Sequence, residues 1–470
     1  MKKARVLGLV AFVAATSLIG ISRVGVNADG AGPELDPWAP TPGVECGPGS
    51  RPEETQGRVP AEDFESGRAA AGYSCNAAIV AHHGDSGGYR VYRYVDENGH
   101  ECAFYDSTLL FPLNVADASV VEDKTGVIVL DMSNPRNPVQ TANLLTPAMQ
   151  SPHESLSLNV TRGLLAAGMG YPTFQPGFVD IYDVSQDCRH PVLQSSTPLG
   201  IVGHEGEFSP DGNTYWVTSP ATSTIVAVDV TDPTMPSIVA VEDRFSIHGL
   251  NISNDGNRFY GADTGSGDGS SGLTILDVSA VQARAESPVI ELVSHLTWDT
   301  VSIPQTAIPV TIDGAPYVVE VDEFGGGDAV GAARIIDIAD ETEPFVVSNL
   351  RLQVNHPDAQ AGEQSADPGA DSGLQGYDAH YCAVPSRVDP GIVACSFIVS
   401  GLRVFDIRDP YNPVEIAYLN QPPAPTARGA SGSYAMSAPT FVPERGEIWY
   451  SDGNSGFYVV RVTNGVWPFA

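Results

Sequence analysis

Three observations in this 470-residue sequence predict an all-β fold built from a repeated unit. First, an apolar run rich in Val and Ile recurs, ends in Asp, and is followed in most copies by a turn that contains Pro. Second, each run is too short for a helix, and β-branched side chains favour strands. Third, successive copies are separated by 46 to 69 residues, the length that four strands and their loops need to form one propeller blade. Because seven copies are present, the sequence predicts a seven-bladed β-propeller of four-stranded blades.

The recurrent run has the features of the third strand of a blade. The first copy spans residues 126–131, and Asp131 is followed by Pro135 and Pro138. Five further copies and a degenerate seventh follow it, at residues 178–183, 225–229, 273–277, 334–337, 402–406 and 456–462. A strand packed between neighbouring blades is apolar on both faces. The terminal Asp accepts hydrogen bonds from N–H groups of the turn, so we interpret these Asp residues as structural rather than catalytic.

These repeats resemble the LVIVD repeat of secreted and surface proteins of bacteria and archaea, a family named after this strand-ending sequence. The resemblance covers roughly residues 100–470 and implies the same propeller fold. It implies no particular chemistry, so any function has to be inferred from other residues.

The N-terminal region reads as a leader followed by an extended arm. Basic residues at positions 2, 3 and 5 precede an apolar stretch at 6–21, and small residues at 26–28 suit a cleavage site, so residues 1–28 are predicted to be a secretory signal peptide. Residues 29–72 are rich in Pro, Gly and acids and are predicted to be a partly disordered arm, which leaves 73–470 for the propeller. The last repeat has only a short tail after its third strand. We therefore expect an N-terminal segment, such as 89–95 or 103–110, to supply the strand that closes the ring.

The charge balance limits the partners of the exported protein. Without the four basic residues of the leader, 20 basic residues stand against 57 acidic ones, and the net charge moves from −33 to −37. Such a surface repels nucleic acid and anionic membranes and favours cations or cationic partners. A solvated acidic surface that suits a saline exterior is the alternative interpretation. We expect a secreted or periplasmic monomer without a membrane span, whose partner is a small ligand, a cation or a protein.

Six cysteines in an exported chain are expected to form disulfides. No Cys-x-x-Cys spacing typical of a metal site is present. The expected pairs are Cys382 with Cys395, which flank a hairpin-like segment, Cys75 with Cys102, and by elimination Cys46 with Cys188.

Loop lengths predict which face of the disc carries function. Tight turns such as 209–212, 253–256 and 312–314 should lie with the Asp-Pro turns on one face, which we expect to be only structural. The longer loops should collect on the opposite face, at residues 168–177, 263–272, 322–331 and 354–377. Elaborated loops on a rigid scaffold commonly bind ligands, and the inner strands should begin on this same face.

A histidine recurs where four of the inner strands begin. Each lies 11 or 12 residues ahead of the second strand of its blade, and the four are His153, His204, His248 and His380. Equivalent positions in the fifth and seventh blades hold Gln305 or Thr306 and Ser437. Imidazoles that converge at a channel mouth could bind copper, zinc or iron, with Glu154, Glu205 or Asp378 as oxygen ligands or as groups that orient the rings. Alternatively, the histidines cap backbone donors and fill a wet channel.

Other motifs are weaker. Residues 84–88 match the nucleophile segment of chymotrypsin-like proteases, but that family places its base far upstream, whereas His82 and His83 adjoin the segment here. Glycine- and Asp-rich loops at 263–269 and 324–328 could hold calcium, although the full calcium-loop spacing is absent, and a plain flexible loop is the alternative.

Two classes of function therefore remain open. The first is a binding or scaffold module that uses the acidic, loop-rich face. The second is a metal-dependent enzyme, such as an oxidoreductase, with the four histidines as ligands and residues 354–377 as a lid. Its layout is similar to that of the selenium-binding protein and methanethiol oxidase propellers, although no contiguous motif matches.

Overall fold

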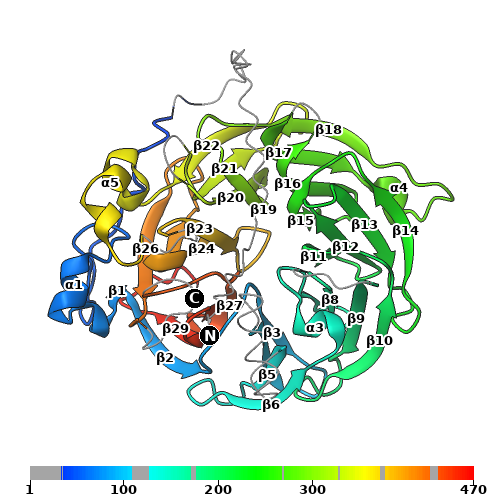
Figure 1. Cartoon of the computed structure of the whole chain (residues 1–470), viewed down its shortest axis with the longest axis horizontal. Coiled ribbons are helices and arrows are strands. Elements are labelled where there is room, and N and C mark those ends of the chain that lie inside the picture. Colours follow the sequence, from blue (N-terminus) through cyan, green and yellow to red (C-terminus); the bar gives the residue numbers. More distant parts are fainter. Residues whose placement is uncertain are drawn as a thin grey trace, which may run out of the picture.

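The structure, a computed structural model, describes residues 33, 35–107, 126–170, 176–266, 269–325, 329–370, 376–423 and 432–469. Its strands form seven separate antiparallel sheets, and Figure 1 shows these sheets arranged as blades around a central axis. The predicted all-β, seven-bladed propeller is therefore confirmed. The predicted signal peptide lies outside the described residues.

The blades are numbered in chain order, and the four strands that each has in common with the others are given from the innermost outward. Blades 1 and 2 are β3 (Val91–Val95), β4 (Glu101–Asp106), β5 (Val127–Asp131) and β6 (Val139–Leu144), then β7 (Ser157–Asn159), β8 (Leu164–Gly168), β9 (Phe178–Asp183) and β10 (Val192–Pro198). Blades 3 and 4 are β11 (Glu205–Phe208), β12 (Thr214–Ser219), β13 (Thr224–Asp229) and β14 (Ser237–Glu242), then β15 (Ile247–Ile252), β16 (Arg258–Ser266), β17 (Ser270–Asp277) and β18 (Glu291–Leu296). Blade 5 is β19 (Ile303–Ile312), β20 (Ala315–Glu323), β21 (Ala333–Asp337) and β22 (Phe345–Leu350). Blade 6 is β23 (Ala379–Ala383), β24 (Ile392–Phe397), β25 (Gly401–Asp406) and β26 (Val414–Asn420), and blade 7 begins with β27 (Thr440–Val442), β28 (Glu447–Asp452) and β29 (Gly456–Val462).

Short helices lie in the connections between strands and in the arm. The α-helices are α1 (Ala61–Ser66), α3 (Pro147–Gln150), α4 (Ser279–Gln282) and α5 (Pro357–Ala361), and the 3-10 helices are η1 (Ala69–Ala71), η3 (Gln353–Asn355), η4 (Glu363–Ala366), η5 (Ile398–Ser400) and η6 (Pro443–Arg445). Within the described part of the chain, none of the helices is both long and apolar enough to cross a membrane.

The recurrent Asp residues have the structural role that the sequence predicts. In six blades the Asp that ends the third strand accepts a hydrogen bond from the backbone N–H two residues later, as in Asp183, where Ser185 donates over 2.7 Å, and in Asp229, where Thr231 donates over 2.9 Å. The other four acceptors are Asp131, Asp277, Asp337 and Asp406. These turns hold the chain at the point where it leaves the third strand for the fourth.

An N-terminal strand closes the ring, as expected, but it is not one of the segments that the sequence suggested. Strand β2 (Ala77–His83) pairs with β29 and becomes the outer strand of blade 7, while β1 (Tyr73–Cys75) adds a fifth strand to blade 6 beside β26. Figure 1 shows both in blue beside the C-terminal blades. The suggested segment at 89–95 instead forms β3, and 103–107 belongs to β4 and the residue after it, while the remainder of 103–110 lies outside the described residues. The apolar alternation of β3 and β4 could not distinguish a closing strand from the first two strands of a complete blade.

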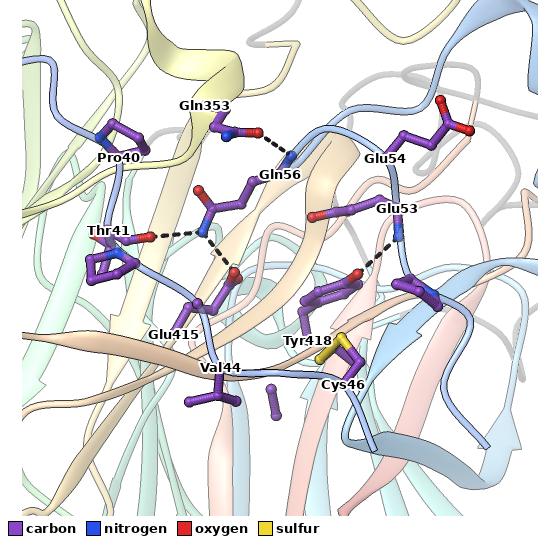
Figure 2. Close-up of a pocket in the computed structure, with 15 residues that line it drawn as sticks. Pro40, Thr41, Val44, Cys46, Glu53, Glu54, Gln56, Gln353, Glu415 and Tyr418 are labelled. Carbon is purple, nitrogen blue, oxygen red and sulfur yellow. Dashed lines mark hydrogen bonds between the residues drawn. A yellow bond between two sulfur atoms is a disulfide. The ribbon is translucent and has the colours of Figure 1, made fainter. Parts of the chain in front are cut away.

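The arm is ordered over residues 35–72, contrary to the predicted partial disorder. It crosses blade 6 through backbone bridges, of which one joins Gly43 to Glu415. Arg403, which is fully buried, donates from Nη1 to Glu53 Oε1 over 2.7 Å and from Nη2 to Glu53 Oε2 over 2.8 Å. A cavity of about 310 Å³ lies between the arm and blade 6, and Figure 2 shows Gln56 joining Thr41 and Glu415 across it. Charge pairing and a disulfide thus add to a small apolar cluster in which Val59 and Ala69 of the arm pack with Tyr73, Cys75 and Tyr418.

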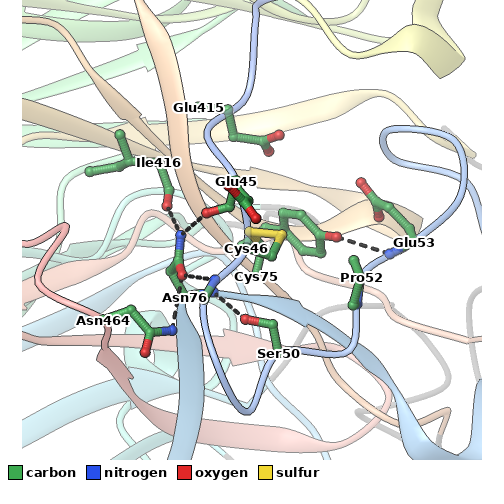
Figure 3. Close-up of a disulfide and its surroundings, with 12 residues drawn as sticks. Glu45, Cys46, Ser50, Pro52, Glu53, Cys75, Asn76, Glu415, Ile416 and Asn464 are labelled. Carbon is green, nitrogen blue, oxygen red and sulfur yellow. Dashed lines mark hydrogen bonds between the residues drawn. A yellow bond between two sulfur atoms is a disulfide. The ribbon is translucent and has the colours of Figure 1, made fainter.

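All six cysteines are paired, and one of the three expected pairs is correct. Cys382–Cys395 joins adjacent strands of blade 6, as predicted. The expected pairs Cys75–Cys102 and Cys46–Cys188 are wrong. Cys46 of the arm instead pairs with Cys75, as Figure 3 shows, and Cys102 of blade 1 pairs with Cys188 of blade 2. The path of the arm brings Cys46 to Cys75, and the packing of neighbouring blades brings Cys102 to Cys188. Neither contact can be predicted from the spacing of cysteines in the sequence.

The two faces differ as the loop lengths predict. The inner strands begin beside the ends of the second strands, since Glu205 pairs with Thr218 and Ile303 pairs with Glu323. Tight turns such as the one between Ile312 and Ala315 occupy the other face. The expected loop at 263–272 is in part an extension of a hairpin, because Ser266 pairs with Ser270. Of the 354–377 insertion, the described residues form η3, α5 and η4, which pack near the arm through the ion pair between Arg58 and Asp367.

Candidate metal centre

The four repeated histidines converge at the propeller axis. His153 precedes β7, His204 precedes β11, and His248 and His380 lie in β15 and β23. The ring centroids of His153 and His204 are 4.3 Å apart, and those of His204 and His248 are 4.5 Å apart. Side chains from blades 2, 3, 4 and 6 therefore form one cluster, although they are separated by more than 200 residues in the sequence.

Glu154 lies at the centre of this cluster. Its Oε2 atom is 3.1 Å from His204 Nε2 and 3.4 Å from His248 Nε2, and its Oε1 atom is 3.4 Å from His380 Nε2. His153 Nδ1 is 3.7 Å from Oε2. Within the described residues, neither Glu154 Oε2 nor His204 Nε2 has a hydrogen bond of good geometry, although Glu154 is 1% exposed. A buried carboxylate in this situation needs a positive partner, which protonated imidazoles or a metal ion can supply.

One ligand atom each of His153, Glu154 and His204 lies within 4.8 Å of the other two, which suits an ion between these three side chains. Imidazole nitrogen and carboxylate oxygen bind zinc at about 2.0–2.2 Å, so two neighbouring ligands of one ion lie about 3.0–3.4 Å apart. The contacts from Glu154 to three imidazoles fall at 3.1, 3.4 and 3.4 Å. Nitrogen and oxygen donors without a thiolate are typical of zinc, copper and iron sites.

Backbone carbonyls orient two of the rings. His248 Nδ1 is 3.0 Å from the carbonyl oxygen of Pro304, and His380 Nδ1 is 2.8 Å from that of Met436. A carbonyl oxygen only accepts, so in both rings Nδ1 carries the proton and donates it. In the neutral rings Nε2 then keeps its lone pair and directs it toward Glu154, which is the arrangement that holds metal-binding histidines in other proteins.

The electrostatics of the cluster follow from its burial. Burial would raise the pKa of Glu154, but its interactions with His153 and His204 outweigh burial and hold the pKa well below the usual value. Burial, reinforced by His204, lowers the pKa of His153 to about 3. Despite the opposing effect of burial, Glu154 and Glu323 raise the pKa of His248 and of His380 to about 9. Without a metal ion the cluster thus holds protons on its two deepest imidazoles, where an ion would replace them.

Local backbone irregularities direct these side chains to the axis. The inner strands β15 and β23 each contain a β-bulge, which leaves His248 and Gly249 opposite one partner in blade 4 and His380 unpaired in blade 6. A bulge changes the direction of a side chain and is common beside functional sites. His153 has a left-handed backbone with a φ of 52°, which is a strained conformation for a residue other than glycine. Gly170 allows it to pack there, because a Cβ atom on Gly170 would collide with the Cβ of His153.

Sequence reasoning missed Glu323, the second carboxylate of the cluster. This residue ends β20, is 6% exposed, and places Oε2 at 3.2 Å from His380 Nε2 and Oε1 at 3.8 Å from His248 Nδ1. It lies within the loop that the sequence marked at 322–331, but the repeat pattern singled out histidines at the starts of the inner strands and not acids at the ends of the second strands. Asp378, which the sequence offered as an oxygen ligand, lies against Gly325 and Gly331, because a Cβ atom on either glycine would collide with its side chain. Burial and the charge of Glu323 raise the pKa of Asp378 to about 8.

Glu205 lies beside the histidine cluster and contacts Arg90 and Tyr381. Its Oε1 atom is 2.6 Å from Arg90 Nη2, and its Oε2 atom accepts a hydrogen bond from the Tyr381 hydroxyl over 2.8 Å. Arg90 also donates from Nε to the carbonyl of Glu154 over 3.1 Å. Burial raises the pKa of Glu205 to about 7. These contacts favour a positioning role for Glu205 rather than the ligand role that the sequence also allowed.

The cluster is open on one side. The side chains of His153 and His204 are 13% and 20% exposed, whereas those of His248 and His380 are 6% and 2% exposed. Tyr89 stacks on His153 with ring centroids 4.6 Å apart. An ion held here could therefore exchange ligands with solvent through the outer pair of imidazoles.

Other sequence candidates have structural explanations. Ser86 of the protease-like segment is buried and donates to the carbonyl of Ser107 over 2.9 Å, and a Cβ atom on Gly88 would collide with the Asp106 carboxylate. The segment therefore belongs to the tight crossing between β2 and β3. In the first calcium candidate, Asp263 already accepts from Gly265 and Thr274, while residues 267–268 and 326–328 lie outside the described residues.

A second group of possible ligands, Asp96, His100 and Asp187, lies near the Cys102–Cys188 disulfide. Asp96 Oδ1 accepts from two backbone N–H groups and Oδ2 from His100 and Cys188. Arg189 pairs with Asp187 over 2.7 Å. This group is saturated by protein donors and serves the packing between blades 1 and 2.

The solved structures to which this chain is similar share little sequence identity with it. No protein-family model matches the chain, so the resemblance to the LVIVD repeat stays a prediction, and no curated protein matches it either. Among solved structures, hydrazine synthase of Kuenenia stuttgartiensis is 13% identical with a TM-score of 0.48, covering 82% of this chain and 98% of its own. The periplasmic gluconolactonase PpgL of Pseudomonas aeruginosa is 14% identical with a TM-score of 0.44, covering 72% and 92%. A protein from Lactobacillus plantarum is 13% identical with a TM-score of 0.46, covering 70% and 84%. These values carry no conclusion about function.

Proposed function

We propose that this protein is an exported β-propeller that binds a transition-metal ion at its axial channel mouth. His153, His204, His248, His380 and Glu154 are the proposed ligands, and Glu323 completes the set or accepts hydrogen bonds from it. The single observation that supports this proposal most is the position of Glu154 Oε2, which is buried, has no well-aligned hydrogen bond within the described residues, and faces two imidazole nitrogens at 3.1 and 3.4 Å. This is therefore a binding module whose ligand is a copper, zinc or iron ion.

Two further features support a role outside the cytoplasm. All six cysteines are in disulfides, which persist in oxidising compartments. The sequence carries a net charge of −33, which raises the local concentration of cations. Secretion or residence in a periplasm and a signal peptide at 1–28 belong to this proposal.

Elemental analysis of the purified chain tests the proposal. We expect an equimolar transition metal in the wild type and its loss in the double variant His204→Ala, His248→Ala. The matched control is His190→Ala, because His190 is an exposed histidine outside the cluster and should retain the metal. If the wild type binds neither copper, zinc nor iron after dialysis against each ion, the proposal is wrong.

A metal-dependent enzyme, such as an oxidoreductase, is the second candidate. The partial exposure of His153 and His204 favours it, because a reacting molecule could reach the ion from that side. Oxygen consumption by the copper-loaded protein with ascorbate as a general reductant would support this candidate. A rate equal to that of the His204→Ala, His248→Ala variant would count against it.

A further inference from the structure

The inner strand of blade 5 contains the same kind of bulge as those of blades 4 and 6. Pairing between β19 and β20 shifts between Pro304 and Thr306, which leaves Gln305 as the extra residue. In blade 6 the extra residue is His380, and in blade 4 it is His248 or Gly249. Gln305 is therefore the blade 5 counterpart of the axial histidines, at the ring position between His248 and His380.

The Gln305 amide is buried without protein partners. The residue is 0% exposed, and within the described residues neither its Nε2 nor its Oε1 atom has a hydrogen bond. A buried polar group without a partner destabilises the fold, and native interiors avoid it except at functional positions or where a small molecule supplies the bonds. An amide carries both donors and an acceptor, so water or another small oxygen ligand matches it.

The surroundings of Gln305 connect it to the metal centre. The carbonyl of the preceding residue, Pro304, holds His248 Nδ1 at 3.0 Å. The strand paired with β19 ends in Glu323, which contacts both His248 and His380. The Gln305 carbonyl lies so close to Gly249 that a Cβ atom there would collide with it. Blade 5 thus contributes an uncharged amide at a place where the neighbouring blades contribute imidazoles.

We propose that Gln305 binds a water molecule or hydroxide that is also a ligand of the metal ion. This inference rests on the proposed metal-binding function and adds to it an exogenous oxygen ligand with a dedicated hydrogen-bonding partner. The ion then has one position that the protein does not fill. Small anions that replace water at metal ions, such as azide, would bind at that position in contact with the amide.

The test compares copper-loaded wild type with the copper-loaded variant Gln305→Leu. We expect equal copper content, an unchanged or higher melting temperature, and about a tenfold change in azide affinity, the size typical of a lost partner beside a metal ligand. The visible and electron paramagnetic resonance spectra should also differ between the two proteins. The matched control is Gln364→Leu, because Gln364 is buried but its Nε2 donates to Val354 over 2.8 Å. This control should lose stability and keep the wild-type spectrum and azide affinity.

The outcomes separate this inference from the proposed function. Wild type without stoichiometric metal refutes the proposed function and the inference with it. Equal spectra and azide affinities in metal-loaded wild type and Gln305→Leu refute the inference alone. Loss of copper in Gln305→Leu also refutes it, because Gln305 would then be a direct ligand rather than the partner of a bound water.

Discussion

The pH dependence of the metal-free protein tests the electrostatics of the cluster. In the folded state the pKa values of His248 and His380 are about 9, against 6.5 in the unfolded chain. A raised pKa means that the folded protein keeps protons that the unfolded chain releases between these values. The stabilisation is fully present below pH 6.5 and is lost as the pH rises to about 9. Each pKa unit corresponds to 1.36 kcal/mol, so the loss is of the order of 3 kcal/mol for each imidazole.

The opposite sign applies to His153. Burial lowers its folded pKa to about 3, so the folded state disfavours its protonation and loses stability as the pH falls below 6.5. Together the three imidazoles should give the metal-free protein its maximum stability near pH 6.5. Urea unfolding in the presence of a chelator, followed by circular dichroism from pH 5 to pH 10, measures this profile.

The variant Glu154→Gln isolates the contribution of the cluster. Buried acids elsewhere also make the protein less stable as the pH rises, since burial raises the pKa of Asp106 to about 7. The relevant quantity is therefore the difference between the stability profiles of the wild type and of Glu154→Gln. We expect the fall between pH 6.5 and 9 to be smaller in the variant, because its His248 and His380 lack the carboxylate that holds their protons. Profiles that stay parallel over this range would refute the reasoning.

In wild type the logarithm of metal affinity should rise with a slope of up to about two per pH unit below pH 9, as the ion displaces the two protons.

Two further predictions concern the scaffold. Arg403→Met should destabilise the protein by about 3–5 kcal/mol in urea unfolding, because it leaves the buried Glu53 and Glu415 without the cation they share, and the double variant with Glu53→Gln should recover part of that loss. No recovery would show that the Arg403 stem, rather than its charge, matters. Gly88→Ala should lower the melting temperature or prevent folding, because its Cβ atom would overlap the Asp106 carboxylate, whereas Gly43→Ala should be nearly neutral because its Cβ atom would lie 3.8 Å from Glu415. Equal melting temperatures for the two glycine variants would contradict this account of the crossing.

The repeated parts of the molecule could be predicted from the sequence, and the unrepeated parts could not. The third strands and the four histidines recur at regular positions, so fold geometry brings His153 and His380 together without any knowledge of contacts. Glu323 was missed because an acid also ends the second strand in blades 1 and 7, as Asp106 and Asp452, so the sequence gives no sign of which acid contacts the histidines. The pair Cys102–Cys188 depends on the contact between blades 1 and 2, for which spacing gives no signal. The order of the arm was not predicted, because its composition does not indicate that Glu53 forms an ion pair with Arg403 of blade 6.

Closure by the two N-terminal strands has a consequence for the order of folding. Five complete blades lie in the chain between β2 and β26, so β1 and β2 leave the ribosome long before their partners β26 and β29. Until β26 and β29 are made, the N-terminal strands have no sheet to join. The incomplete ring then has unpaired strand edges, with which other chains could pair. A truncated chain that lacks the last blade should therefore aggregate instead of forming a smaller disc.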